Sequence, residues 1–505
     1  MYAVPPRKKT KGVFSMKKHD QTALILALFL SCSAFLTSCG DAAQTASTDT
    51  SADDTTSASE ETTADDYGYV DPSIGKKDYG GRTFTIVYPN WSLYNNYYFA
   101  EEYDGDIVND SIYNRAKYVE ERLGIEFAYY NPGYVEAVFP AVQKTVLAGS
   151  PDYDLALTHC ATSIVSYPKE GIVLDWNALP GVDLDKPYWN QSVRENFEVD
   201  GILPFMSSDY ILPDVNSVFF NTKLIADNAL DDPYDLVLSG KWTWTKLRDM
   251  AKVAAQDLNG DSVMDDQDQY GFVCERGWQT SSVPISCGQQ FFAADAEGIP
   301  ELAMNNEKSQ NILEMFTALL WNDGSSFSWE YKAEYDPNNG GKPPVDFGSG
   351  RSMFYLTPLS LAVSFRDTEV DYGILPLPKY DETQKDYLTL NWAGFMCVPA
   401  SAGDPELVGL VAELLASESC RTVIPAFYDV LLGEKVARDE KAKETLDIIF
   451  ENDIYDLGVN LGYYGLFCDQ LKDSSPDNSA FIAKKLNAVN KDISDYVDGC
   501  RSYKK

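Results

Sequence analysis

Apolar residues between positions 82 and 158 change repeatedly between a spacing typical of strands and one typical of helices. Short runs are rich in β-branched and aromatic residues, whereas longer runs repeat at helical spacing and stop at Gly124 and Gly149. The strands expected are 82–88, 125–130 and 154–158, and the helices between them are 107–123 and 134–148. This alternation predicts an α/β lobe with parallel neighbouring strands.

The remainder of the chain continues this mixture of strands and helices. An apolar stretch over 203–220, interrupted by Pro204 and Pro213, predicts a pair of strands that cross between two lobes. Further helices are expected at 309–321, at 404–417 and over most of the C-terminal region. Roughly 430 residues follow the N-terminal segments, too many for one hydrophobic core, so two lobes are expected.

The N-terminal region has a different pattern. A basic group at Met16-Lys17-Lys18, which is the better start of the protein, precedes an apolar run over 23–36. The run is shorter than the roughly 20 apolar residues of a membrane-spanning helix, so it predicts a secretory signal over 1–38. Residues 41–66 are acidic and rich in Ser and Thr, and they predict a flexible linker within 39–78.

The last residues of the signal form a second motif. Leu36-Thr37-Ser38-Cys39 resembles the bacterial lipobox, in which the cysteine is lipidated and becomes the new N-terminus. The resemblance implies a lipid on Cys39 and an extracytoplasmic protein anchored to the outer face of the cell membrane. An ordinary signal peptide with an incidental cysteine, or a single-span anchor, is the alternative.

Charge and histidine content narrow the function. The 505 residues include 77 acidic and 41 basic ones, and the formal net charge of −36 argues against a nucleic-acid partner. Only His19 and His159 are present, and His19 belongs to the signal, which argues against a histidine-dependent triad or zinc site. A glycosidase stays possible on this ground, because it needs only two carboxylates.

Seven of the nine cysteines follow the signal and Cys39. Their odd number and wide spacing do not indicate a disulfide framework, although a pair such as Cys274 and Cys287 stays open. The chain also has 32 Tyr and 9 Trp residues. Most are expected to pack in cores, and the remainder could stack on a flat, hydroxyl-rich ligand such as a sugar.

Oxygen-bearing residues between 257 and 268 follow the spacing of an EF-hand loop. Ser262 replaces the usual glycine at position 6, and the last position holds the shorter Asp in place of Glu. We expect a structural Ca²⁺ that joins the preceding helix to the strand over 270–273, with a solvated acidic turn as the alternative; no organic cofactor is expected. The expected ligands are Asp257, Asn259, Asp261, the backbone carbonyl of Val263, Asp265 and Asp268.

Several motifs occur in a familiar order behind the lipobox. They are 154–158, 219–223, 242–244, 257–261, 270–272, 347–353 and 372–378. Together they resemble the extracellular solute-binding proteins of family 1, the maltose-binding-protein-like lipoproteins of ABC importers. The resemblance implies an α/β, two-lobed periplasmic-binding-protein-like fold of type II, with crossing hinge segments and a ligand cleft between the lobes.

The same resemblance implies where the lobes and the cleft lie. The N-terminal lobe is expected over 79–209 and 373–417, and the C-terminal lobe over 210–372 and 418–505. The cleft residues expected are Trp91, His159, Cys160, Asp209, Tyr210, Trp278, Tyr355, Thr357 and Trp392. The family's stacking Trp near position 357 is absent here.

The resemblance further implies a binding protein without enzyme activity, which captures a sugar or oligosaccharide and delivers it to the transmembrane subunits of an ABC permease. A monomer is expected. Two alternatives stay open: the same fold could bind another solute or serve a membrane sensor, and a surface glycosidase or polysaccharide adhesin would have a different activity.

Overall fold

The computed structural model describes residues 69–91, 95–159, 162–274, 277–328, 347–365, 368–431, 433 and 440–503. The signal, Cys39 and Cys160 lie outside the described residues, and so does the side chain of Trp278. Within the described ranges, no helix is long and apolar enough to cross a membrane.

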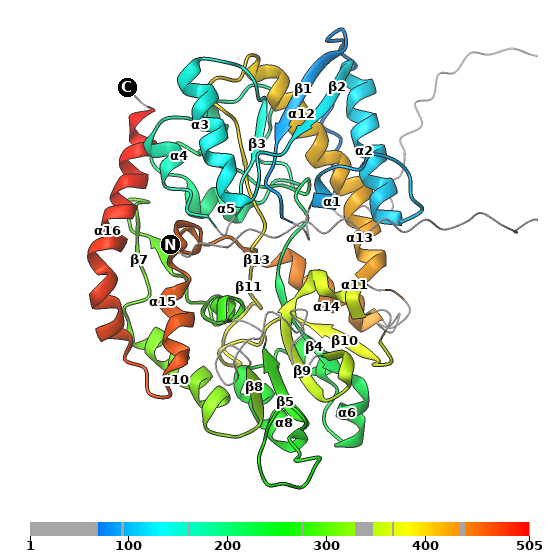
Figure 1. Ribbon diagram of the computed structural model, residues 1–505, viewed down its shortest axis with the longest axis vertical. Coiled ribbons are helices and arrows are strands. Elements are labelled where there is room, and N and C mark those ends of the chain that lie inside the picture. Colours follow the sequence, from blue (N-terminus) through cyan, green and yellow to red (C-terminus); the bar gives the residue numbers. More distant parts are fainter. Residues whose placement is uncertain are drawn as a thin grey trace, which may run out of the picture. The chain divides into compact units, whose positions relative to one another are not determined.

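The first lobe is built on a four-stranded sheet with the order β12-β3-β1-β2 (Figure 1). Its strands are β1 (Arg82–Val87), β2 (Ile125–Tyr130), β3 (Leu155–Leu157) and β12 (Met396–Cys397). β1 runs parallel to β2 and β3, which confirms the predicted parallel arrangement, and β12 runs antiparallel to β3. Phe84, Ile86 and Leu155 are fully buried, and burial of such side chains fixes the register of the strands.

The main helices of this lobe follow the predicted bounds closely. α2 (Ile107–Leu123) begins after Asp106, whose carboxylate accepts hydrogen bonds from two amides of the first turn, and ends at Gly124 with φ 62°. α3 (Val138–Ala148) begins later than predicted, because Val135–Ala137 forms a 3₁₀ turn. The other helices beside this sheet are α1 (Asn95–Tyr98), α4 (Ser166–Lys169), α5 (Gln191–Phe197) and α12 (Pro405–Glu418).

The second lobe is built on a five-stranded sheet with the order β10-β4-β9-β5-β8. Its strands are β4 (Asn216–Asn221), β5 (Tyr270–Cys274), β8 (Ser326–Ser328), β9 (Ser352–Pro358) and β10 (Tyr372–Leu375). β5 runs parallel to β8 and β9, whereas β4 runs antiparallel to β9 and β10. A separate hairpin is formed by β6 (Phe292–Ala294) and β7 (Pro300–Leu302).

Helices pack around this second sheet and between the two sheets. Trp244 is the first residue of α8 and Trp242 lies two residues before it, and both side chains are buried. The helices are α6 (Thr222–Asp227), α7 (Pro233–Leu238), α8 (Trp244–Ala254), α9 (Ser282–Ser286), α10 (Glu307–Trp321), α11 (Ala362–Phe365), α13 (Ile424–Leu431), α14 (Glu440–Glu451), α15 (Gly465–Cys468) and α16 (Asn478–Ser502).

Extended segments connect the two sheets. Met206 pairs with Met396 beside the first sheet, and Val215 pairs with Asn391 beside the second. β11 (Thr389–Leu390) also pairs with β13 (Asp453–Ile454), which adds a third segment at the junction (Figure 1). Two α/β lobes joined by crossing segments are therefore confirmed.

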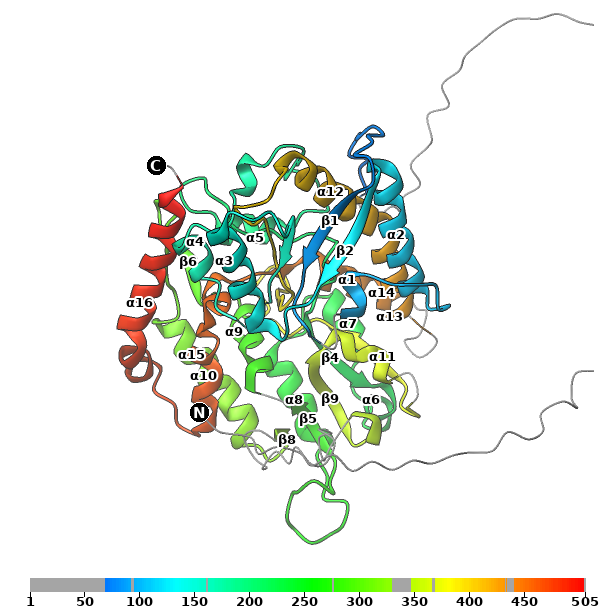
Figure 2. The ribbon, with the colours of Figure 1, turned by 45° about the horizontal axis from the view of Figure 1, so that its top comes forward.

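The return crossing lies later in the chain than the predicted lobe boundary at 373. Tyr372–Leu375 forms β10 and pairs with β4 in the second sheet, so this segment still belongs to the second lobe. The chain re-enters the first sheet only at β12. At the other end of the chain, α16 packs against α4, and both views place it on the side away from α2 (Figure 2).

The six cysteines within the described residues are buried thiols. Cys274 and Cys287 are among them, and no disulfide joins this pair. Burial raises the pKa of the Cys287 thiol to about 12, so it stays protonated and unreactive at neutral pH.

Candidate functional site

Three parallel strands of the first sheet end at the same edge, facing the junction with the second lobe. The chain continues from β1 to Trp91, from β2 to Tyr134 and from β3 to His159. In open α/β sheets, ligands bind beyond the carboxyl ends of the strands. A ligand-binding surface is therefore expected at this edge.

The three residues form one aromatic group, which we call the strand-end group (Trp91, Tyr134 and His159). The Trp91 ring centre lies 5.5 Å from that of Tyr134 and 4.5 Å from that of His159. Tyr134 is 53% exposed, whereas His159 is buried beneath Trp91, with only 4% exposed. Burial lowers the pKa of His159 to about 4, so its ring is neutral near pH 7. The partly buried indole and the exposed phenol beside it are tilted by 42°, and each offers ring surface on which a ligand can stack.

The carboxyl edge of the second sheet is polar. Asn216 and Ser217 begin β4 there, while Ser328 ends β8 and Thr357 lies near the end of β9. Ser217 and Thr357 are directly paired across the strands. All four are fully buried, and the amide oxygen of Asn216 and the three hydroxyl groups have no hydrogen-bond partner among the described residues.

Buried polar groups in native proteins normally have a hydrogen-bond partner, so we expect a partner for each of these four oxygens. The chain that directly follows β5 and β8, residues 275–276 and 329–346, lies outside the described residues. A ligand hydroxyl or an ordered water at this edge would satisfy such groups.

The crossing segment between β11 and β12 leads back to the first sheet. Asn391 accepts a hydrogen bond from the amide of Ala393 at 2.8 Å, and its own amide group donates to Asp453. The Trp392 ring packs edge-on against Tyr464 at 5.6 Å. A Cβ at Gly394 would lie only 2.0 Å from the carbonyl oxygen of Thr158, next to His159. The backbone of the crossing segment therefore passes close to the end of β3.

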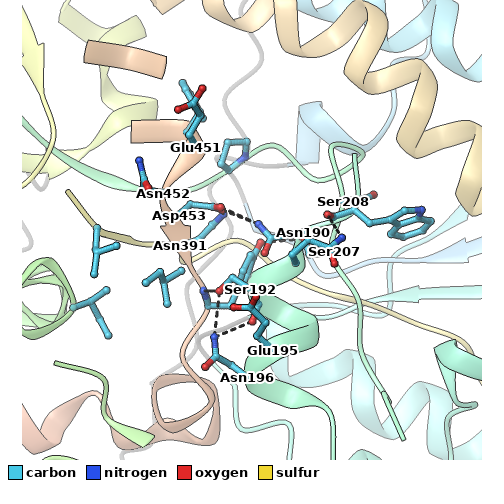
Figure 3. Close-up of a pocket in the computed structure, with 18 of the residues that line it drawn as sticks. Asn190, Ser192, Glu195, Asn196, Ser207, Ser208, Asn391, Glu451, Asn452 and Asp453 are labelled. Atoms are coloured by element: carbon cyan, nitrogen blue, oxygen red, sulfur yellow. Dashed lines mark hydrogen bonds between the residues drawn. The ribbon is translucent and has the colours of Figure 1, made fainter. Parts of the chain in front are cut away.

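The junction also carries a cavity of about 810 Å³, lined in part by Asn391, which we call the hinge pocket (Figure 3). Asp453 stands in its wall and accepts hydrogen bonds from the amide groups of Asn190, at 2.9 and 3.0 Å, and of Asn391. Gln290 of the second lobe donates to Asn196 of the first lobe at 2.8 Å. The pocket is therefore lined by both lobes and by the crossing segments.

The structure places the predicted cleft residues that it describes in different surroundings. Trp91 and His159 pack against each other and Trp392 packs against Tyr464, whereas Asp209 lines the hinge pocket. Tyr210 and Tyr355 belong to the hydrophobic core. Thr357 lies at the polar edge of the second sheet.

The two core tyrosines have structural partners. The guanidinium of Arg115 lies 4.6 Å from the centre of the Tyr210 ring, and the Tyr210 hydroxyl donates to the carbonyl of Tyr98. Tyr355 is 1% exposed and packs against Phe347. Neither side chain is open to a ligand in this arrangement.

Sequence reasoning missed Tyr134, Asn216, Ser217 and the amides around Asp453. Tyr134 follows the second strand as Trp91 follows the first, so counting strand ends would have found it. The hinge pocket gives no comparable local signal, because Asn190 and Asp453 are 263 positions apart in the chain.

The predicted calcium loop connects α8 to β5 and extends away from the sheet (Figure 2). Asp257 accepts hydrogen bonds from the amides of Gly260 and Ser262, at 2.6 and 2.8 Å. Asp268 is buried and accepts from the amides of Leu258 and Asp265, which holds its pKa below the usual range. Ser262 has φ 67°, the left-handed conformation that favours glycine at this position.

The loop's carboxylates thus bind the loop's own amides. Among the residues that the structure describes, no three His, Cys, Asp or Glu side chains are grouped closely enough to hold a metal ion. Calcium binding stays a prediction.

No protein-family model matches the chain, and no curated protein matches its sequence. Solved structures do match. UspC of Mycobacterium tuberculosis has a TM-score of 0.55 at 16% identity, over 81% of this chain and 100% of its own. An ABC substrate-binding protein of Listeria monocytogenes in complex with cycloalternan has a TM-score of 0.53 at 13% identity, over 82% and 99%.

A third match has a different type of ligand. UgpB from Mycobacterium tuberculosis, in complex with glycerophosphocholine, has a TM-score of 0.53 at 13% identity, over 82% of this chain and 99% of its own. These proteins are similar to the chain in fold over nearly their whole length. The chain therefore has the two-lobed α/β fold of ABC solute-binding proteins.

Proposed function

We propose that the protein is an extracytoplasmic solute-binding protein of family 1, which captures a sugar or oligosaccharide between its lobes and delivers it to an ABC permease. The observation that carries this proposal is the strand-end group. It lies at the ligand-binding edge of an α/β sheet, in a fold shared with ABC solute-binding proteins.

A carbohydrate is the class of ligand that suits the carboxyl edges of both sheets. A sugar ring presents a flat apolar face that stacks on indole and phenol rings, and Trp91 and Tyr134 supply them. Its hydroxyl groups both donate and accept hydrogen bonds, which suits the four buried oxygens at the edge of the second sheet. Binding and release need no bond chemistry, and we assign no catalytic residue.

A thermal-shift screen of the secreted protein against a glycan panel tests this function. A ligand at 100 times its dissociation constant should stabilise the protein by about 2.7 kcal/mol. Trp91→Ala should abolish the shift, whereas Tyr103→Ala, which removes an exposed tyrosine elsewhere on the same lobe, should keep it. If no glycan stabilises the protein but glycerophosphodiesters or peptides do, the carbohydrate class is wrong.

The lipid on Cys39 would keep the binding protein near its permease. The lipobox resemblance and the acidic linker support this part of the proposal. Cys39→Ala should release a protein that still binds ligand into the medium. Retention of that variant on the membrane would contradict the anchor.

Calcium at the 257–268 loop would have a structural role. The EF-hand spacing supports it, and so does the ionised, buried Asp268. Binding requires the carboxylates to turn from the loop's amides toward the ion. Calcium should therefore raise the melting temperature of the wild type, and Asp257→Asn should remove the effect. An unchanged melting temperature in saturating calcium would contradict this role.

A further inference from the structure

The hinge pocket is distinct from the strand-end group, and the proposed function does not use it. It is one of the larger cavities of the protein, at about 810 Å³, and this volume is in the range of small-molecule sites. Trp189, Ile211, Ile424 and Phe450 give it apolar walls. A cavity of this size, with apolar walls and several polar groups, is typical of a ligand-binding site.

The charge of the wall is one-sided. No Lys, Arg or His is among the described residues that line the pocket. Its carboxylates are Glu195, Asp209, Asp447, Glu451 and Asp453. Glu195 and Glu451 are exposed, whereas Asp209, Asp447 and Asp453 are partly buried. Partly buried carboxylates are normally paired with cations, and here Asp453 has only amide partners.

Two of the acids are close enough to repel each other. Burial raises the pKa of Asp209 to about 7, and the nearby charge of Asp453 adds to this effect. Burial also raises the pKa of Asp453, although Asn190 and Asn391 donate hydrogen bonds to it. A bound cation would relieve both the repulsion and the loss of hydration.

The spread of the acids excludes a simple metal site. No three His, Cys, Asp or Glu side chains of the described residues could hold one ion together. Separate ammonium groups joined by methylene chains match separate carboxylates with apolar wall between them. We infer that the hinge pocket is a second binding site, which takes an aliphatic amine carrying two or more ammonium groups.

Binding in the hinge pocket should also depend on the arrangement of the two lobes. α5 belongs to the first lobe, whereas Gln289 and Gln290 belong to the second. An occupant that contacts both must bind one lobe arrangement better than another, and it will shift the lobes toward that arrangement.

Calorimetric titration of the full mature protein with spermidine tests the inference, with hexane-1,6-diol as the uncharged probe. An acidic protein attracts amines everywhere on its surface, but this attraction is screened at about 0.5 M NaCl. We expect saturable binding at a single site under these conditions, and no heat of binding with the diol.

Charge-neutralising variants locate the site. Glu451→Gln, at the exposed rim, and Asp453→Asn, in the wall, should each weaken spermidine binding about tenfold or more. Asp249→Asn is the matched control, because it removes an acid from another acidic hollow of the surface. Glu451→Gln keeps the test valid if Asp453→Asn fails to fold.

Three results would overturn the inference. These are the absence of saturable spermidine binding, binding of the diol with equal affinity, and equal weakening by Asp249→Asn. The last result would mean that the amine is a diffuse counter-ion of the surface.

Discussion

The strand-end group and the hinge pocket both lie at the junction of the lobes, but they are built from different chemistry. The strand-end group consists of aromatic rings at the carboxyl ends of three parallel strands, whereas the hinge pocket is acidic and lined with amides. None of the three aromatic residues is among the described residues that line the pocket. One hinge thus carries two surfaces of opposite character.

The largest effect should come from the close backbone contact between the crossing segment and the end of β3. Gly394→Ala places a Cβ 2.0 Å from the carbonyl oxygen of Thr158. We expect the free energy of unfolding to fall by about 3 kcal/mol in urea denaturation, because rigid backbone must move. Gly403→Ala is the matched control, since its Cβ would meet Pro151 at an ordinary 3.4 Å. Equal stability of the two variants would contradict the contact.

The stability contributions of the strand-end group and of the hinge pocket should respond to pH with opposite signs. Burial lowers the pKa of His159 to about 4, so its contribution to stability is full above its unfolded pKa and is lost as pH falls toward 4. Burial raises the pKa of Asp209 to about 7, so its contribution is full at acid pH and is lost as pH rises toward 7.

Thermal unfolding between pH 4 and pH 8 measures this contrast. Asp209→Asn should exceed the wild type in stability at pH 8 by about 1 kcal/mol or more and lose this advantage as the pH falls. His159→Gln should lose less stability than the wild type as the pH falls. Parallel profiles for both variants and the wild type would show that neither group titrates as its burial indicates.

A smaller effect is expected from the contact between the lobes in the hinge pocket. Asn196→Ala removes the acceptor of the Gln290 amide, and such a hydrogen bond contributes about 1 kcal/mol to stability. Glycan affinity should stay within about threefold of the wild type, because Asn196 and Gln290 line the hinge pocket and not the strand-end group. A larger change would show that the hinge couples the two sites, and calorimetric titration would detect it.

Local patterns predicted the elements that build the strand-end group. The bounds of α2, its stop at Gly124 and the parallel β1, β2 and β3 all follow from apolar spacing and from glycine in the left-handed conformation. Trp91 and His159 could be found because they directly follow strands. Their position in the chain fixes their position in the sheet.

The hinge pocket could not be predicted in this way. Asn190, Asn391 and Asp453 come from three separate segments, and only the folded crossing strands bring them together. Tyr210 and Tyr355 were predicted to line the cleft, but they lie in the core. Arg115 packs over the Tyr210 ring, and Tyr355 packs against Phe347, and neither partner can be recognised from the local sequence.

The central claim is that the solute binds at the strand-end group and not in the hinge pocket. Calorimetric titration of the best glycan into the wild type, Trp91→Ala and Glu451→Gln tests it most directly. The account predicts that Trp91→Ala loses at least about tenfold in affinity while Glu451→Gln binds as the wild type does. Full affinity in Trp91→Ala together with a loss in Glu451→Gln would contradict it and would place the solute in the hinge pocket.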